Sequence, residues 1–397
     1  MNSAAAATLN VKVPLGSSYQ PVSVLNAATG LTGYSNENFV PGFLSTTPNL
    51  SPKINISTFD PPTHMSLTDI DGDGKADLIA TKKVQGGIAI FKNISVSSEI
   101  NKSSFAELVN FPAGTDPAFV VVKDINGDGK PDLIVSNIAN GTISVLKNTS
   151  VTGTINSSSF AARVVYATGA GPLSISIGDL DLDGKPDMVI ANSRGNTITV
   201  YRNLSNAGTI AFAEKQDLVV GDNPASVAIT DIDGDGKPEI IATVYSANKL
   251  AVFKNTSYQS ISFSAKVDVA TGSRPQFVSV GDVDGDGLND LVVANSESKS
   301  LSIFRNVGIT GSVTASSFAP KVDLAVASRP SAVTLGDITG DGKPEIIAVS
   351  NIGHSIVIYK HNSAAGVITA NSFLKPVSID AIAQLNSVIT GDVDNDG

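Results

Sequence analysis

The chain of 397 residues contains no cysteine, no tryptophan and only three histidines. Without cysteine it can form neither a disulfide framework nor a thiolate metal site, and a cysteine nucleophile is excluded as well. Three scattered histidines argue against a histidine-rich zinc site. No apolar run reaches the roughly 18 residues that a membrane-spanning helix requires. Charged residues make up only 16% of the chain, which excludes a highly charged, disordered polymer.

The first feature that is present is a net charge of −10, from 37 acidic and 27 basic residues. Of the acidic residues, 25 lie in seven short loops described below, and the rest of the sequence is basic. The acidity is therefore a local property of those loops. It indicates little about the partners of the whole surface.

An acidic string recurs seven times and divides the chain into repeats. The first copy, DIDGDGKAD, begins at Asp69, and successive copies begin 51 to 55 residues apart. A phenylalanine precedes six copies by 19 residues, and in six copies an apolar segment ends 24 residues after the first Asp. Because these inner spacings are constant, the length variation is confined to one linker in each repeat. We therefore expect one geometry, repeated along the chain.

Each repeat is predicted to contain four strands. Apolar residues alternate before each loop, as at Val120 and Val122, which is the period of a strand with two different faces. A short apolar run such as 133–135 follows the loop, as expected for a strand buried on both faces. A third strand alternates again, and a fourth follows the phenylalanine, as at Lys266–Val269. Patterns typical of helices are absent.

Four short antiparallel strands repeated about every 50 residues are typical of a β-propeller blade. One blade cannot cover its own apolar faces, whereas a closed ring covers them and limits exposed strand edges. We therefore expect an all-β fold, a seven-bladed β-propeller whose last blade is truncated. The alternatives are a β-solenoid, whose coils are usually shorter, and a string of small sandwiches, which needs more strands in each unit.

The repeated loop has the pattern D-x-[DNT]-x-D-G-x-x-[DE], which favours a calcium site. It offers side-chain oxygens at loop positions 1, 3, 5 and 9 and a backbone carbonyl at position 7, and glycine at position 6 allows a sharp turn. This number of protein ligands favours Ca²⁺ over Mg²⁺. A polar turn that binds nothing would explain one copy, but six complete copies argue against it. An EF-hand is excluded, because position 12 carries no glutamate and strands flank the loop.

The predicted ligands form six complete loops and one incomplete loop. They are Asp69, Asp71, Asp73, Lys75 and Asp77; Asp124, Asn126, Asp128, Lys130 and Asp132; Asp179, Asp181, Asp183, Lys185 and Asp187; Asp231, Asp233, Asp235, Lys237 and Glu239; Asp282, Asp284, Asp286, Leu288 and Asp290; Asp337, Thr339, Asp341, Lys343 and Glu345; and Asp392, Asp394 and Asp396. We expect loop six to bind most weakly, because the Thr339 hydroxyl is an uncharged ligand. Leu182 replaces the usual glycine at position 4 of loop three, without an evident effect on the ligands.

These loops and their flanking strands resemble the FG-GAP/VCBS repeats of integrin-alpha-like propellers over residues 51–397. The resemblance implies a seven-bladed ring with about six complete Ca²⁺ sites, each in the hairpin that joins the first two strands of a blade. It also implies a secreted or cell-surface protein with a role in adhesion or carbohydrate contact. No inserted adhesion domain is present, and the long linkers are typical of bacterial proteins.

The repeat phase also predicts how the chain is divided. Residues 1–45 are expected to be the end of an Ig-like (IPT/TIG) domain or a linker, and residues 46–397 the propeller. Residues 51–58 align with the outer strand of the other units and should complete blade seven, whose inner strand is expected at about 386–391. The two middle strands of that blade are missing, so we expect the chain to be part of a longer protein.

The favoured function is that of a calcium-stabilised extracellular adhesion or ligand-binding module. Its ligand is expected to be a protein or glycan on the face opposite the calcium loops, with no nucleic acid and no membrane span. A slight excess of basic residues on that face suggests an acidic ligand such as a uronic-acid glycan, although ordinary solvated charges are the simpler explanation. No catalytic motif is present, so no enzyme activity is expected. The alternatives are an accessory propeller of a secreted polysaccharide-degrading enzyme and a lectin.

Overall fold

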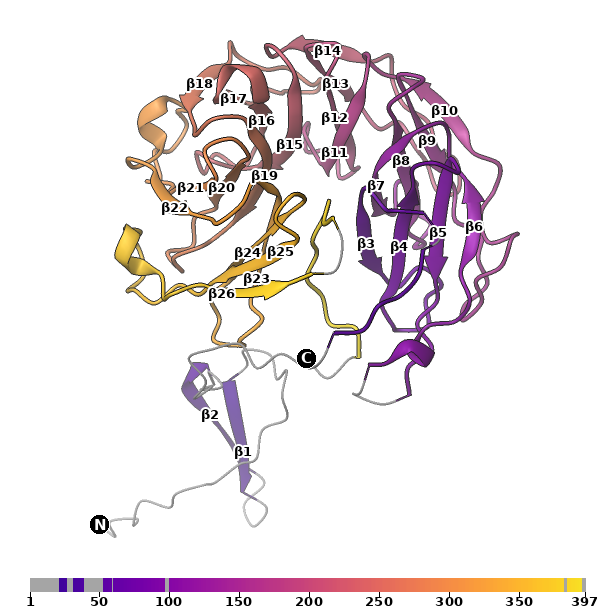
Figure 1. The fold of residues 1–397 in the computed structure, drawn as a ribbon, viewed down its shortest axis with the longest axis horizontal. Helices are drawn as coiled ribbons and strands as arrows, with labels where there is room; N and C mark the ends of the chain where they lie inside the picture. Colours follow the sequence, from indigo (N-terminus) through magenta and orange to yellow (C-terminus); the bar gives the residue numbers. More distant parts are fainter. Residues whose placement is uncertain are drawn as a thin grey trace.

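The computed structural model describes residues 21–26, 31–38, 53–58, 60–96, 100–381 and 384–394. Within the part from residue 60 onward, six four-stranded antiparallel sheets stand around a common axis (Figure 1). In each sheet the strands follow one another in chain order, and the first strand lies innermost. The predicted β-propeller is therefore confirmed.

The strand bounds repeat closely from blade to blade. Blade one contains β3 (Met65–Thr68), β4 (Asp77–Lys82), β5 (Gly87–Phe91) and β6 (Val109–Pro112). Blade two contains β7 (Pro117–Lys123), β8 (Asp132–Asn137), β9 (Thr142–Leu146) and β10 (Val164–Ala167). Blade three contains β11 (Pro172–Gly178), β12 (Asp187–Asn192), β13 (Thr197–Tyr201) and β14 (Gln216–Val219).

Blades four to six have the same plan. Blade four contains β15 (Pro224–Thr230), β16 (Glu239–Val244), β17 (Lys249–Phe253) and β18 (Val267–Ala270). Blade five contains β19 (Pro275–Gly281), β20 (Asp290–Asn295), β21 (Ser300–Phe304) and β22 (Val322–Ala325). Blade six contains β23 (Pro330–Gly336), β24 (Glu345–Ser350), β25 (Ser355–Tyr359) and β26 (Val377–Asp380). The only helices among the described residues are the 3₁₀ turns η1 (Lys102–Ser104), η2 (Tyr245–Ala247), η3 (Ala315–Ser317) and η4 (Ala370–Ser372), so none could span a membrane.

Burial follows the apolar patterns of the sequence. Every residue of the second strand in blades two to six is buried, as its unbroken apolar run predicts. Neighbouring blades share apolar clusters: Val252 of blade four, for example, packs in one cluster with Val278 and Leu291 of blade five. Such inter-blade burial is the main source of stability in a ring of small sheets, because no blade has a core of its own.

The ring continues between blades six and one through segment 384–391. Asn386 Nδ2 donates to the carbonyl of Pro62 at 2.9 Å, and Thr390 Oγ1 donates to that of Leu335 at 3.4 Å, so the segment lies where an innermost seventh strand would stand. Lys53 Nζ donates to the carbonyl of Asp380 at 3.3 Å, so the chain at Lys53 approaches the end of β26. Residues 386–391 were expected to form the inner strand of blade seven and residues 51–58 its outer strand. In the structure neither segment 384–391 nor segment 53–58 pairs as a strand.

The described residues therefore form six complete blades, not seven. At the place of the seventh blade they include only segments 384–391 and 53–58. This arrangement is compatible with a truncated last blade. Exposure of the apolar residue at loop position 2 marks the open side: in loop six Ile338 is 37% exposed. Its equivalents are at most 2% exposed, because the middle strands of the next blade cover them: Ile70, Ile125, Leu180, Ile232 and Val283.

Most of residues 1–45 lie outside the described part of the chain, including most of the predicted Ig-like remnant. Two strands are described there, β1 (Pro21–Asn26) and β2 (Leu31–Asn38), which pair in antiparallel fashion. The domain division at residue 45 stays a prediction.

Candidate metal centres

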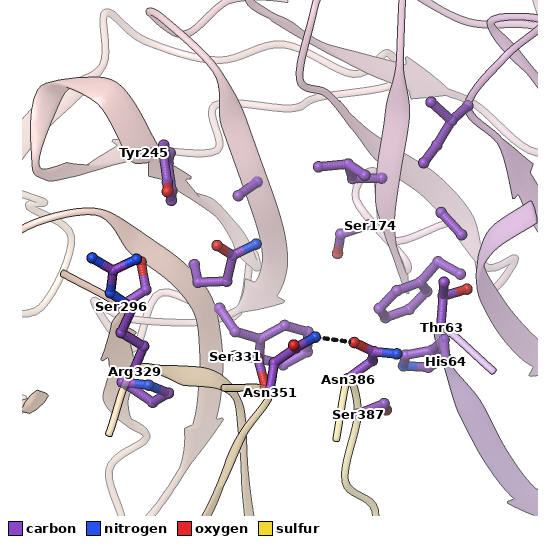
Figure 2. Close-up of a pocket in the computed structure, with 18 of the residues that line it drawn as sticks. Thr63, His64, Ser174, Tyr245, Ser296, Arg329, Ser331, Asn351, Asn386 and Ser387 are labelled. Carbon is purple, nitrogen blue, oxygen red and sulfur yellow. Dashed lines mark hydrogen bonds between the residues drawn. The ribbon is translucent and has the colours of Figure 1, made fainter. Parts of the chain in front are cut away.

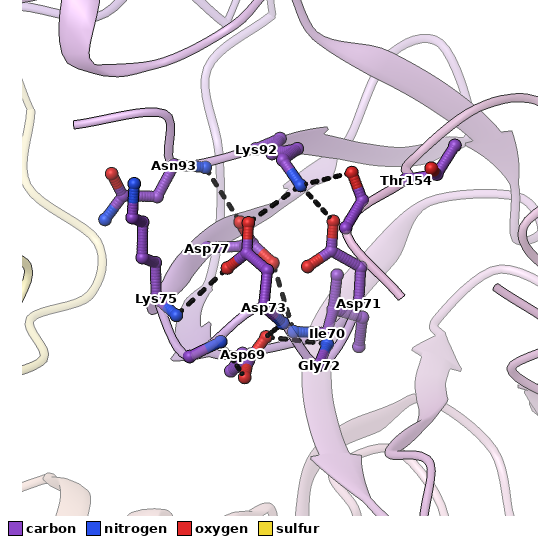
Figure 3. A network of polar contacts seen from close by, with 12 residues as sticks. Asp69, Ile70, Asp71, Gly72, Asp73, Lys75, Asp77, Lys92, Asn93 and Thr154 are labelled. Atoms are coloured by element: carbon purple, nitrogen blue, oxygen red, sulfur yellow. Dashed lines mark hydrogen bonds and ion pairs between the residues drawn. The ribbon is translucent and has the colours of Figure 1, made fainter. Parts of the chain in front are cut away.

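Each of the six complete acidic loops connects the first and second strands of a blade, as predicted. Its first Asp organises the turn: Asp69 accepts hydrogen bonds from the backbone N–H of Gly72 through Oδ1 and of Gly74 through Oδ2, both at 2.8 Å (Figure 3). The bond from the position-6 glycine to this carboxylate recurs in all six complete loops. These glycines have positive φ, a conformation that side chains disfavour. The invariant glycine at position 6 is thereby explained.

The carboxylate at position 9 is buried and anchors the loop to two backbone groups. Asp77 accepts from Ile70 N at 3.0 Å and from Asn93 N at 2.7 Å, and it is 0% exposed. Burial raises its pKa to about 6, and the neighbouring carboxylates Asp71 and Asp73 add to the rise. Burial likewise raises the pKa of its equivalents, to about 6 or 7 where the shift is large: Asp132, Asp187, Glu239, Asp290 and, less strongly, Glu345.

Position 3 provides the observation that points to a cation. Asp71 is only 3% exposed; its Oδ2 meets the ammonium of Lys92, and its Oδ1 is buried without any hydrogen-bond partner (Figure 3). The position-3 carboxylates of loops three and five, Asp181 and Asp284, each have one such orphaned oxygen as well. A buried carboxylate oxygen without a partner is costly, and a cation bound in the loop would satisfy it.

Positions 5 and 7 contact each other. In every complete loop the position-7 backbone N–H donates to the position-5 carboxylate, as from Lys75 to Asp73 at 3.0 Å. The same bond is formed by Lys130, Lys185, Lys237, Leu288 and Lys343.

Carboxylate oxygens of positions 1, 3 and 9 converge to within 4.8 Å of one another in loops one, three, four and five. In loop two the amide of Asn126 stands at position 3, and its Nδ2 is buried without a partner. In loop six Thr339 donates to Glu345 Oε1 at 3.0 Å and accepts from Lys360 at 2.9 Å, so its hydroxyl already has partners. Asp392 and Asp394 of loop seven are described, whereas Asp396 lies outside the described residues.

A basic residue faces each of the six complete loops and was not predicted from the sequence. It stands 23 residues after the first Asp, and its side chain contacts the carboxylate at position 3, position 5 or both. Lys254, for example, pairs with Asp233 and with Asp235, the latter at 2.9 Å. The others are Lys92, Lys147, Arg202, Arg305 and Lys360. Its constant spacing was visible in the sequence and could have identified it.

A buried asparagine at the next residue was likewise missed as part of the site. Asn203 Nδ2 donates at 2.9 Å both to the carbonyl of Pro186 in its own loop and to that of Ile125 in the loop of the preceding blade. Its Oδ1 accepts from Ser205 N at 2.8 Å. The inter-blade bond recurs for Asn93, Asn148, Asn255 and Asn306. In blade six His361 takes this place.

The donor set therefore fits a hard divalent cation. Carboxylate oxygens, one of them orphaned, and a nearby backbone carbonyl are the ligands that Ca²⁺ prefers, and no thiolate or imidazole takes part. Loops one, three, four and five fit best. In loops one and three a bound ion would take the orphaned position-3 oxygen, while Lys92 or Arg202 keeps the other oxygen of that carboxylate.

The charges on the opposite face are largely paired within the protein. Arg329 and Arg274 both contact Glu297, at 3.0 and 3.7 Å, and Lys83 lies 3.8 Å from Asp116. Lys249 pairs with Asp268 at 2.5 Å, and buried Lys82 donates to Asn110. These basic residues therefore already have partners within the protein, and Arg329 and Arg274 share one carboxylate.

Similarity to solved structures supports the fold. A protein of Lactobacillus plantarum matches with a TM-score of 0.54, 16% identity and coverage of 91% of this chain and 92% of that one. BBS1N, crystallised in complex with ARL6DN, matches with a TM-score of 0.55, 13% identity and coverage of 83% and 85%. Virginiamycin B lyase of Staphylococcus aureus matches with a TM-score of 0.51, 12% identity and coverage of 81% and 85%. At these identities the likeness concerns the fold alone.

Sequence comparison connects the loops to a family. A T-cell immunomodulatory protein homolog of Plasmodium falciparum (isolate 3D7) is 31% identical over 147 residues, which take in 32% of this chain and 20% of that protein. The chain thus spans about a fifth of that relative's length. The FG-GAP-like repeat matches residues 69–135, 124–190, 179–242, 231–293 and 282–348, each match running from one acidic loop past the next. These matches together span more than half of the chain, which therefore belongs to the FG-GAP-like repeat family.

Proposed function

We propose that this chain is a calcium-stabilised β-propeller that acts as an extracellular adhesion or ligand-binding module. The observation that carries the calcium part is the orphaned, buried oxygen of Asp71, repeated at Asp181 and Asp284. It is supported by the convergence of three carboxylates in each of four loops. Calcium suits an extracellular setting, where weak sites of this kind are filled.

The role of the cation would be structural. Two of the loops contact the linker of the next blade: Gly153 N, in the linker of blade two, donates to the carbonyl of Asp71 in loop one, and Gly311 N, in the linker of blade five, donates to that of Asp233 in loop four, both at 3.1 Å. A filled loop therefore fixes an inter-blade contact as well as a hairpin. At a Ca²⁺ concentration of about ten times Kd, four such sites would add about 6 kcal/mol of stability. That is comparable with the whole margin of a typical domain, about 5–15 kcal/mol.

Thermal unfolding in the presence of Ca²⁺ and of EGTA tests this proposal. We expect the melting temperature to fall by well over 10 °C without Ca²⁺ and to recover with Ca²⁺ but only partly with Mg²⁺, which prefers fewer protein ligands. Equal melting temperatures with and without Ca²⁺ would contradict it.

Two variants of the same blade make the test site-specific. Asp284→Asn removes a buried loop carboxylate, whereas Asp323→Asn changes an exposed carboxylate on β22 that pairs with Lys321. Calorimetric titration should show one Ca²⁺ fewer for Asp284→Asn and an unchanged stoichiometry for Asp323→Asn.

The ligand would bind on the face opposite the loops. The loops close one end of every blade, and their side chains are occupied with the turn itself. The other end presents hairpin turns that differ from blade to blade, which is where recognition usually resides on a repeated scaffold.

A further inference from the structure

A cavity of about 420 Å³ lies on the ring axis, at the end opposite the acidic loops. Residues near the start of the innermost strands line it, together with the turns after the second strands, such as those at Tyr245 and Asn351 (Figure 2). Segment 384–391 contributes Asn386 and Ser387, so the ring is closed around the cavity. This volume is within the range of small-molecule sites, about 300–1,000 Å³.

One repeated position brings side chains of different kinds to this cavity. It stands five residues before the first loop Asp, and its members His64, Phe119, Ser174, Phe277 and Ser387 line the cavity, whereas Ser226 and Ala332 at the same position are buried and do not. A β-bulge adjoins it in blades two to six, as between Pro117 and Phe119, and bulges re-aim side chains. The next position is apolar in every repeat, as at Val120 and Val278, whereas this one ranges from alanine to phenylalanine.

The aromatic members of this position gather on one another. His64 stacks on Phe119 with ring centroids 3.5 Å apart, and Phe119 lies 6.4 Å from Phe277 of blade five with the ring planes 23° apart. Burial lowers the pKa of His64 to about 3, so its imidazole is neutral. These rings give the cavity an apolar, flat-sided floor.

Above this floor the cavity offers neutral polar groups. Within the described part of the chain, the side chains of Gln276, Tyr245 and Ser387 form no hydrogen bond with the protein, and all three line the cavity. The amide of Asn351 donates to Asn386, whose own amide donates to Pro62, so these two are held in place (Figure 2). A ligand that supplies hydroxyl groups would satisfy the unpaired amide and hydroxyls.

The charges at the rim do not favour an anion. Arg329 and Arg274 share Glu297, and Lys83 faces Asp116, so an acidic ligand would have to displace internal partners. The charged residues among those that line the cavity are Lys83, Arg329 and Glu297, and both basic ones have an acidic partner. An apolar flat surface beside neutral donors and acceptors matches a molecule with a C–H face and a rim of hydroxyls.

We propose that the axial pocket binds an uncharged saccharide, stacked on the Phe119 and Phe277 side and hydrogen-bonded by Gln276 and Tyr245. This names the ligand class of the interaction module proposed above and therefore rests on that proposal. Because Asp116 and Glu297 already pair with the basic residues at the rim, we expect uronic acids to bind less tightly than neutral sugars.

Saturation-transfer NMR and calorimetric titration of the calcium-loaded, full 397-residue chain test the pocket. The probes are glucose, galactose, mannose, N-acetylglucosamine and their disaccharides, with glucuronic and galacturonic acid as charged counterparts. We expect saturable binding of at least one neutral sugar, tighter than that of its acidic counterpart. Binding of none of these sugars, or preference for the acids, would overturn the proposal.

Conservative variants locate the site without threatening the fold. Tyr245→Phe and Gln276→Leu should each weaken binding by about two- to tenfold, the usual range for one neutral hydrogen bond. Tyr258→Phe is the matched control, because Tyr258 is 80% exposed and does not line the cavity. Binding that neither pocket variant weakens would show that the sugar binds elsewhere and would refute the assignment. Melting curves recorded with and without EGTA on the same samples report on the calcium proposal separately.

Discussion

The two ends of the ring differ in what repeats. At the loop end, the same side chains occupy the same places in blade after blade: a capping Asp, a buried acid, a basic partner and, in five blades, an inter-blade asparagine. At the pocket end, the position five residues before the loop changes from histidine to phenylalanine, serine and alanine. Repetition at one end supports the proposed structural role of the loops, and variation at the other supports the proposed role in ligand binding.

Substitutions should therefore separate the two ends: changes at the loop end should alter stability, and changes at the pocket end should alter binding alone. The four tests below run from the largest expected effect to the smallest.

Acidification acts on the loop end in all blades at once. Because burial raises the pKa of the position-9 carboxyls above their unfolded value, the folded, calcium-free chain holds more protons than the unfolded chain between about pH 4 and 7. Its stability from these groups is therefore full below about pH 4 and is lost as the pH rises toward about 7. We expect the melting temperature in EGTA to be higher at about pH 5 than at about pH 7.5.

Calcium should reverse this dependence, since protons compete with the cation for the same carboxylates. The stabilisation by Ca²⁺ should shrink on acidification over the same window. If the melting temperature in EGTA instead decreases when the pH is lowered from about 7.5 to about 5, the pKa values of Asp77 and its equivalents are not raised by burial in the calcium-free protein.

Removal of the inter-blade asparagine tests one blade contact. Asn203→Ala leaves two buried carbonyls and one N–H without partners, which should cost about 2–4 kcal/mol. Gln276→Ala removes an amide of similar kind at the pocket end and should change stability by less than about 0.5 kcal/mol. Urea unfolding of both variants in Ca²⁺ measures the difference, and equal losses would remove the distinction between the ends.

The basic residue facing a loop should have opposite effects with and without the cation. Lys254→Met removes the partner of Asp233 and Asp235, so we expect a loss of about 1 kcal/mol in EGTA but tighter Ca²⁺ binding at that loop. Lys266→Met breaks an ion pair with Asp268 away from the loops and should leave Ca²⁺ affinity unchanged. Calcium titration followed by urea unfolding distinguishes the two. Weaker Ca²⁺ binding by Lys254→Met would indicate that the lysine supports the site instead.

The smallest effect concerns the leucine at position 4 of loop three. Leu182 adopts φ 60°, in the left-handed region, where the other complete loops have glycine. Leu182→Gly should stabilise the chain by about 0.5–1 kcal/mol by removing this strain. Gly127→Leu at the same position of loop two should destabilise it by a similar amount. If both changes have the same sign, backbone strain is not the cause.

The sequence predicted the loop end well because its periodicity is strict. Two patterns each predicted one local structure, and the structure contains both. The spacing from Asp69 to Asp77 predicted the hairpin loop, and the alternation at Val120 and Val122 predicted the strand before the next loop. The number of blades was harder to predict. Strand pairing of 386–391 depends on partner strands that the described residues do not include, so only the position of this segment was predicted correctly.

The pocket end could not be predicted from residue patterns. His64, Phe119 and Phe277 lie more than 50 residues apart in the sequence and meet only because the ring closes. The partners of Arg329 and Lys83 likewise come from neighbouring turns. The sequence does show that the position five residues before the first loop Asp varies from repeat to repeat. This variation points to the pocket only once the structure shows that residues at this position line the cavity.

The inter-blade asparagine bonds all point in one direction, from each blade to the loop of the one before it. Asn148 therefore finds its acceptor, Ile70, already synthesised, and so do Asn203, Asn255 and Asn306. Asn93 is the exception, since its acceptor is Val393, 300 residues later. During translation each new blade can dock on a finished neighbour, whereas the first blade completes this hydrogen bond only after residue 393 has been made.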